Sequence, residues 1–224
     1  MTVEITTRGL DSIIERLHGL PETIEQAETL AVNAGVRYAH TAASRGIREQ
    51  VNLPARYLGS AASGGNDRLK ITKYAKPGDP EAVIRGRERP TSLARFVVGS
   101  KTLGKRTPGR PVRVKVSAKG SAKTMPGAWL MRLRAGRVLD DDTFNVGLAV
   151  RLKPGESINK REFVNTFGDY EFGENRRSPR AGRMYMLYGP SVAQVFDDVA
   201  VDIEGPVSTR VESEFVRQFE RLNK

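Results

Sequence analysis

The sequence predicts an α+β fold: N-terminal helices, a central, mostly antiparallel β-sheet with long basic loops, and C-terminal helices. Two observations predict it. Apolar residues recur every three or four positions towards both ends of the chain, whereas in the middle they alternate with polar residues. We expect a single α+β domain over residues 1–224. It would have a helical part at 1–60, a β-rich part at 61–188 and C-terminal helices at 189–224.

The N-terminal part contains three helical segments. Residues 9–17 show one apolar face of a short helix, and Pro21 suits the first position of a long amphipathic helix over residues 21–50. A third, short helix follows, with Asn52 as its N-cap and Pro54 in its first turn. The apolar stripe expected for the long helix is Leu20, Ile24, Ala27, Ala31, Ala34, Tyr38 and Ala42.

The clearest strand of the middle part is residues 111–117, PVRVKVS. Its valines would point inward, while Arg113 and Lys115 would point outward. Exposed loops are expected within 99–127, on either side of this strand, and at 153–182. Further strands are predicted at 69–75, 81–86, 94–98, 129–133, 144–152 and 184–187.

The C-terminal part begins with a turn at residues 189–191. Val192 then opens a helical face, and Pro206 opens or kinks a final helix, so the sequence predicts helices in the plural here. The apolar stripe of the final helix is Val207, Val211, Phe215, Phe219 and Leu222.

Composition excludes several classes of protein. The 224 residues include no cysteine, which excludes disulfides, cysteine nucleophiles and thiolate metal sites. No apolar run approaches the ~20 residues of a membrane helix, and we expect neither a membrane partner nor a secretory signal. The net charge is +11. Between Glu88 and Asp140 there are thirteen Lys or Arg residues and no Asp or Glu, a distribution suited to a polyanion or to the stacking of subunits.

One segment imitates a phosphate-binding loop. Residues 99–106, GSKTLGKR, place a lysine after two glycines and follow a predicted strand. The chemistry requires Ser or Thr after the lysine and a helix behind it, but Arg106 takes that place and the prolines that follow cannot propagate a helix. We therefore interpret the segment as a basic surface loop.

No other motif supports catalysis. Ser191 lies between a strand and a helix, as a hydrolase nucleophile would, but both histidines, His18 and His40, lie far upstream on predicted helices. We expect Ser191 to cap the helix and the histidines to be core or surface residues. Residues 140–142, three consecutive aspartates, suit a solvated turn better than a metal site. The sequence thus predicts no enzyme, no cofactor and no metal.

The basic residues offer a contact surface instead. Lys and Arg could neutralise phosphates, but the aromatic residues needed to stack bases are almost absent from the run. The surface would suit duplex backbone or an acidic protein, and a solvated basic face is the plain alternative. The candidate contact residues are Lys101, Lys105, Arg106, Arg110, Lys119, Lys123 and Trp129.

Three segments carry a resemblance to a known family. Residues 124–130 (TMPGAWL) with 133–137 (LRAGR) resemble the "PGAF-x-x-x-L-x-x-G-x" segment of the phage minor tail protein Z family. Residues 51–58 (VNLPARYL) are similar to the short helix before the first strands of that family. Residues 187–192 (LYGPSV) are similar to the closing turn and helix of tail completion proteins.

This resemblance implies a structural virion protein, a tail completion or neck component that finishes the head-proximal end of a phage tail and mediates head–tail joining. Similar neck proteins form homo-oligomeric rings, usually hexamers, stacked on the tail tube. The implied partners are the tail tube or tail terminator protein and the head–tail connector proteins, with tape-measure protein or genomic DNA in the lumen as further candidates. The implied location is the virion tail or neck, after assembly in the host cytoplasm, with no cofactor and no catalysis.

The competing function is a non-enzymatic, basic nucleic-acid-binding protein. Tight binding to duplex DNA at physiological salt, with a steep dependence on salt, would favour it. A discrete ring with weak affinity for DNA would favour the structural role. An enzyme is a distant third, which hydrolytic activity abolished by Ser191→Ala would revive.

Overall fold

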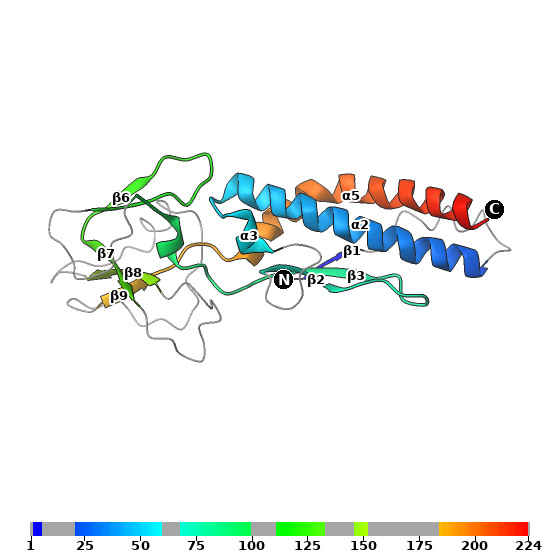
Figure 1. The fold of residues 1–224 in the computed structure, drawn as a ribbon, viewed down its shortest axis with the longest axis horizontal. Helices are drawn as coiled ribbons and strands as arrows, with labels where there is room; N and C mark the ends of the chain where they lie inside the picture. The colour runs from blue at the N-terminus through cyan, green and yellow to red at the C-terminus, as the bar shows by residue number, and fades with distance from the viewer. Residues whose placement is uncertain are drawn as a thin grey trace. The chain divides into compact units, whose positions relative to one another are not determined.

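The computed structural model describes residues 2–5, 21–59, 68–99, 111–132, 146–151 and 184–223. The predicted helix at 9–17 and loop at 153–182 lie outside them. The described elements begin with a strand, β1 (Thr2–Ile5), in the part predicted to be helical. They then run from a long helix through antiparallel strands to a second long helix, which confirms the α+β class (Figure 1). The chain divides into two compact units, unit 1 (residues 1–89 and 191–224) and unit 2 (residues 90–190). That both belong to one domain stays a prediction.

Helix α2 (Pro21–Gln50) has the bounds that the sequence predicts. Its buried stripe differs from the expected one, because Ala34 and Ala42 are half-buried and Tyr38 is 42% exposed. The buried side contains a row of residues spaced by four: Ala27, Ala31, Gly35, Ala39, Ala43 and Ile47. Since small residues occur on several sides of α2, the packing partner decides which side is buried.

Helix α5 (Val192–Leu222) is continuous, so the predicted separation into two helices at Pro206 is wrong. Pro206 lies inside the helix and is exposed to solvent. The buried residues Val199, Val207 and Val211 continue through it at multiples of four. Their packing holds the helical path even though proline removes one backbone hydrogen bond.

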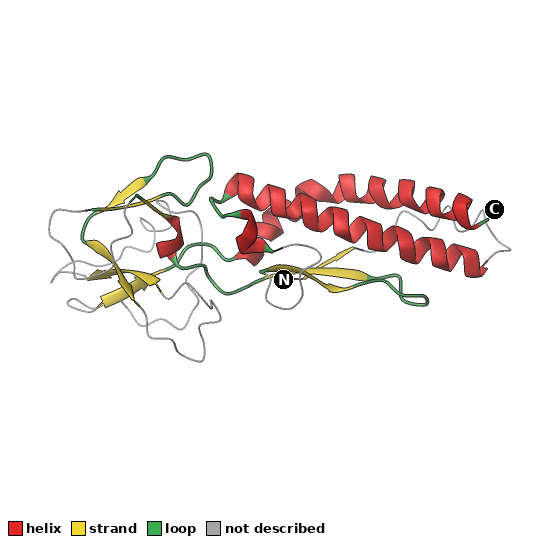
Figure 2. Cartoon of the chain, viewed as in Figure 1, coloured by secondary structure: helices red, strands yellow, loops and turns green. Residues whose placement is uncertain are grey.

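Helices α2 and α5 lie side by side and antiparallel (Figures 1 and 2). Gly35 of α2 faces Val211 of α5, and Gly46 faces Val199 further along. A Cβ atom at Gly35 would clash with the Val211 side chain, and one at Gly46 would lie 2.6 Å from Val199 Cγ1. The glycines therefore allow the two helix backbones to approach closely.

A three-stranded antiparallel sheet completes unit 1, formed by β1 (Thr2–Ile5), β2 (Leu69–Lys73) and β3 (Ala82–Gly86) in the order β1-β3-β2. Both long helices contact it. Asn33 of α2 donates to Ala75 O at 3.0 Å and accepts from Ala75 N at 2.9 Å, which anchors the β2–β3 hairpin. At the other end of the sheet, a Cβ on Gly86 would lie 2.8 Å from Ala193 Cα.

The short helix α3 (Ala55–Leu58) follows α2, as predicted, but its cap differs. Pro54 occupies the N-cap position and no side chain caps the helix, so the prediction of Asn52 as N-cap is wrong. Proline has no side-chain acceptor, and α3 is held instead by packing: Tyr57 and Leu58 are buried, and the guanidinium of Arg68 lies 4.3 Å from the Tyr57 ring centroid.

Unit 2 has two further three-stranded antiparallel sheets. One joins β4 (Val97–Val98), β5 (Val112–Val114) and β6 (Lys123–Met125), and the other joins β7 (Ala128–Arg132), β8 (Val146–Arg151) and β9 (Met184–Leu187). The last of these strands has its predicted bounds. The buried side chains of unit 2 include Leu93, Phe96, Val114, Leu130, Leu148 and Leu187.

Two predictions for unit 2 are corrected. The strand expected at 94–98 is mostly a 3-10 helix, η2 (Leu93–Phe96), followed by the two residues of β4. The exposed loop expected within 99–127 contains strand β6, which pairs with β5. The segment 123–125 lacks apolar alternation, so its strand depends on pairing with a neighbour and has no local signal.

The described helices contain no stretch that is both long enough and apolar enough to cross a bilayer.

Candidate functional site: a basic face in unit 2

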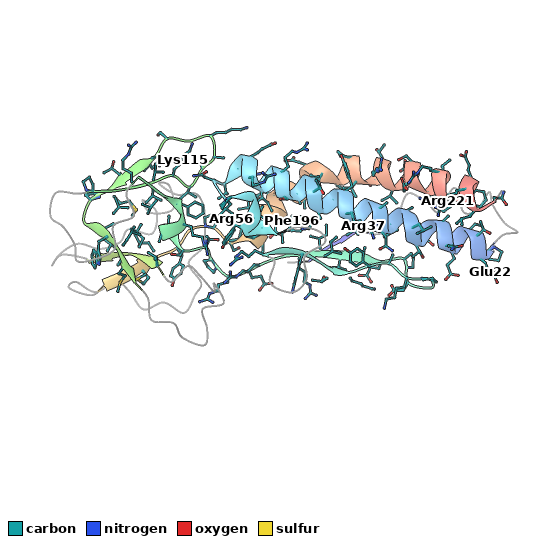
Figure 3. All side chains as sticks on the ribbon, viewed as in Figure 1. Glu22, Arg37, Arg56, Lys115, Phe196 and Arg221 are labelled. Atoms are coloured by element: carbon teal, nitrogen blue, oxygen red, sulfur yellow. The ribbon has the colours of Figure 1, made fainter. Side chains whose placement is uncertain are left out.

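Strands β5 and β6 form a hairpin that carries basic side chains. Val112 pairs with Met125 and Val114 with Lys123, and the Ser117 hydroxyl accepts from Gly120 N at 3.2 Å in the connection. Lys119 and Lys123 are both exposed, one in the connection and one on β6. Lys115, on the same hairpin, is labelled in Figure 3. Two of the seven predicted contact residues thus lie on one short hairpin.

One face of the β4-β5-β6 sheet is buried and the other is open. Val97 and Val114 are opposite each other and nearly inaccessible, at 7% and 1% exposure. Directly paired residues share a face of a sheet, and the neighbouring row of Val98, Arg113 and Thr124 is exposed. Val98 is 44% exposed. We call the exposed row of Val98, Arg113 and Thr124, taken together with the exposed Lys119 of the hairpin connection, the basic face.

Of the seven predicted contact residues, only Lys119 belongs to the basic face, because Lys123 pairs with Val114 and so lies in the row of Val97 and Val114. Trp129 lies on β7, in the other sheet of unit 2, opposite Ala149 and half-buried. Lys101, Lys105, Arg106 and Arg110 lie outside the described residues, as does the phosphate-loop-like segment after Gly99. Sequence reasoning placed Arg113 outward but missed the exposed Val98 beside it. Alternation of polar and apolar residues within a strand does not show which face of the sheet other parts of the protein will cover.

Ser191 is a helix cap, as predicted. Its side chain accepts from Gln194 N at 3.1 Å, and the Gln194 side chain accepts from Ser191 N at 3.0 Å. This reciprocal arrangement is a capping box at the start of α5. Ser191 is 3% exposed, so its hydroxyl is neither free nor accessible to a substrate.

His40 is a core residue, one of the two roles predicted for the histidines. It is 2% exposed, and its Nε2 lies 3.0 Å from Leu69 O, which links α2 to β2. His18 and residues 140–142 lie outside the described residues. Within the described parts of the chain, no group of three or more His, Cys, Asp or Glu residues could hold a metal ion.

Two ion-pair clusters of unit 1 shift pKa values for structural reasons. Hydrogen bonds from Lys73 to Glu81 and then to Asp79 raise the pKa of Lys73 and close the end of the β2–β3 hairpin. On α5, a hydrogen bond from Arg217 lowers the pKa of the buried Glu214, and Gln218 adds a second bond at 2.8 Å. Both clusters stabilise local structure.

A family model described as prophage minor tail protein Z (GPZ) matches residues 7–144. The match covers more than half of the chain, from before α2 to beyond β7, and includes the whole basic run from Arg89 to Arg137. Comparisons with curated proteins and with solved structures gave no match. The resemblance seen in residues 124–137 is thereby confirmed as family membership. The chain belongs to the prophage minor tail protein Z family and is a structural component of the phage tail.

Proposed function

We propose that this tail protein is a tail completion protein of the neck, assembling as a ring at the head-proximal end of the tail and joining tail to head. The unequal charge of the two units supports the proposal. Residues 90–190 hold 20 Lys or Arg against 8 Asp or Glu, whereas the rest of the chain holds 17 against 18. A protein that joins two different structures needs unlike contact surfaces, and such a charge distribution supplies them.

The partners follow from this role. Copies of the chain form the ring, a hexamer in the proposal, between the tail tube or tail terminator protein and the head–tail connector proteins. The basic residues of unit 2 contact an acidic partner surface, tape-measure protein or genomic DNA in the lumen. The chain assembles in the host cytoplasm and remains in the virion. The proposed contact residues are Lys101, Lys105, Arg106, Arg110, Lys119, Lys123 and Trp129.

Removal of the gene from the virus tests the role. We expect filled heads and tails of normal length to accumulate separately, and purified protein added to the lysate to restore joined, infectious particles. Gold labelling of an epitope-tagged chain should mark the head-proximal end of the tail. Joined particles in the absence of the chain, or a label along the tail or at its tip, would contradict the proposal.

Charge reversal tests the contact residues. Changing Lys101, Lys105, Arg106 and Arg110 together to Glu should abolish joining, because four attractive charges become repulsive. A matched control changes four exposed basic residues of unit 1 to Glu: Arg45, Arg56, Lys76 and Arg221. Infectious joined particles from the first variant would rule out this loop as a contact.

A second candidate function is nucleic-acid binding, favoured by the thirteen basic residues without an acidic one between Glu88 and Asp140. Titration of the full chain with duplex DNA distinguishes this function from that of a tail completion protein. A submicromolar Kd at physiological salt, with a steep loss of affinity as salt rises, would favour the DNA-binding function. Weak DNA affinity together with ring formation would favour the tail completion protein.

A further inference from the structure

The outer side of α5 has an exposed apolar centre surrounded by acids. Val201 is 74% exposed, more than the other large apolar side chains described as exposed. Asp198 and Glu204 lie three residues to either side of it, Asp202 follows it, and all three are exposed. Residues three and four apart are neighbours on a helix surface, so these side chains form one patch. We call Asp198, Val201, Asp202 and Glu204 the acidic face.

Nothing in the helix balances these charges. Residues 184–209 contain no Lys or Arg, and in the described parts of the chain no ion pair involves Asp198, Asp202 or Glu204. Like charges four residues apart repel each other. The helix dipole favours acids within the first turn, but the first turn of α5 has none. The arrangement therefore costs stability in the isolated chain, and a cationic partner would offset that cost.

The basic face of unit 2 has the complementary composition. It also has an exposed valine, Val98, and places Arg113 directly opposite it on the neighbouring strand, with Lys119 in the adjoining hairpin connection. Each face thus combines an apolar centre with charges of one sign. An apolar core with a polar rim is a common arrangement of interfaces between proteins.

We propose that the acidic face of one copy binds the basic face of a second copy of this chain. Val201 packs against Val98, while Arg113 and Lys119 pair with the carboxylates of Asp198, Asp202 and Glu204. The inference rests on the proposed assembly into a ring and adds the two surfaces that form the subunit seam. Because the surfaces differ, a pair of bound copies still has one free acidic face and one free basic face. Further copies can therefore add at either end, and in the proposed assembly the chain of copies closes into a ring.

Complementary charge reversal of the full chain tests the seam. The acidic-face variant is D198K/D202K/E204K and the basic-face variant is R113E/K119E. Each alone should self-associate at least about a hundredfold more weakly than the unchanged chain, since opposed like charges are strongly unfavourable. Mixed in equal amounts, the two variants should recover assembly. The reversed acidic face of one variant, now positive, meets the reversed basic face of the other, now negative, and the two unchanged faces still attract each other.

Sedimentation velocity at low and at physiological salt measures the association, which should weaken as salt screens the charges. The matched control for the acidic-face variant is E22K/E49K/E220K. It makes the same change in net charge at exposed residues elsewhere in unit 1 and should assemble normally. Glu22 is labelled in Figure 3. Recovery in the mixture also shows that both variants are folded.

Three results would overturn the seam: an unchanged chain that stays monomeric at every concentration, single variants that assemble normally, or a mixture that stays dissociated. Loss of DNA binding in the basic-face variant with unchanged self-association would overturn it too and assign that face to DNA. The position of the protein in the virion is read separately, by gold labelling. A label at the neck with no effect of charge reversal would disprove the seam and leave the proposed function standing.

Discussion

At the scale of single residues, two glycines set how closely the long helices approach. Gly35 and Gly46 lie under Val211 and Val199, and any side chain at either position would meet the facing valine. Glycine in a helix interior costs about 1 kcal/mol relative to alanine. That cost is offset here by the packing of two valines directly against the backbone of α2.

Gly35→Ala should therefore destabilise the protein, by about 1–3 kcal/mol, in spite of the better helix propensity of alanine. The clash is with a single side chain, so Val211→Ala should relieve it. In urea unfolding, the Gly35→Ala/Val211→Ala double variant should lose less free energy of unfolding than the two single variants lose together. Additive losses, within about 0.5 kcal/mol, would show that the glycine does not act through Val211.

Glu214 makes the stability of unit 1 depend on pH. Its side chain is buried on α5, and the hydrogen bond from Arg217 holds its pKa below the ordinary 4.5. A carboxyl whose pKa is lower in the folded state stabilises it at pH values above the unfolded pKa. This contribution is lost as the pH falls through the folded pKa.

Glu214→Gln should lower the free energy of unfolding by about 1 kcal/mol at neutral pH. The loss is this small because Arg217 is largely exposed, so solvent screens its interaction with Glu214. The difference in unfolding free energy between the unchanged chain and this variant should shrink as the pH falls below 4.5. Urea unfolding across that range measures it. Glu212→Gln, at an exposed position of the same helix, is the control and should show no such trend. A difference that is constant with pH would contradict the assigned cause.

The composition of the basic face was only partly predictable. Arg113 is exposed as predicted, because alternation within a strand fixes which side chains share a face. Val98 belongs to a segment predicted as a simple strand, and its exposure depends on which neighbours cover the sheet. That information lies in the pairing of β4 with β5, fourteen or more residues away along the chain, and not in the local sequence.

At the scale of elements, the starts of the two long helices were predicted better than their buried faces. Pro21 begins α2 and Ser191 caps α5, both through local backbone chemistry that a short sequence contains. The buried side of α2 was misassigned at Tyr38. Alanines lie on more than one side of that helix, and the close approach of α5 at Gly35 selects among them.

Pro206 shows the same contrast between local cost and tertiary packing. Its ring removes the hydrogen bond that residue 206 would donate to Asp202 O, and the sequence alone therefore suggested a break. The buried residues Val199 and Val207 lie eight residues apart, on either side of it and on one side of the helix, and α5 continues.

Pro206→Ala should raise the stability of the protein by about 1 kcal/mol or more, since it restores that hydrogen bond at an exposed position. The midpoint of urea unfolding measures the gain. Ser208→Ala, also exposed in α5, is the control for a change of helix propensity without a new hydrogen bond, and should shift the midpoint less. A loss of stability would show that Pro206 bends α5 along a path that its packing requires.

At the scale of the whole molecule, unit 1 is built from both ends of the chain. Residues 1–89 supply α2 and the sheet, and residues 191–224 supply α5. The helices bury their apolar sides mainly against each other and the sheet, including Phe196, Val207 and Phe215 of α5 (Figure 3 labels Phe196). Most of the stability of a helix in a protein comes from such packing and little from the helix alone.

A chain that ends at residue 190 should therefore lose α2 as well as α5. Far-UV circular dichroism should show a loss of helical signal roughly twice that expected from α5 alone, because the two helices have 30 and 31 residues. A peptide of residues 191–224 added to the shortened chain should restore much of the signal by pairing with α2. If the shortened chain kept the full helicity of α2, the helix would be stable without α5, and the antiparallel pair would not be what holds unit 1 together.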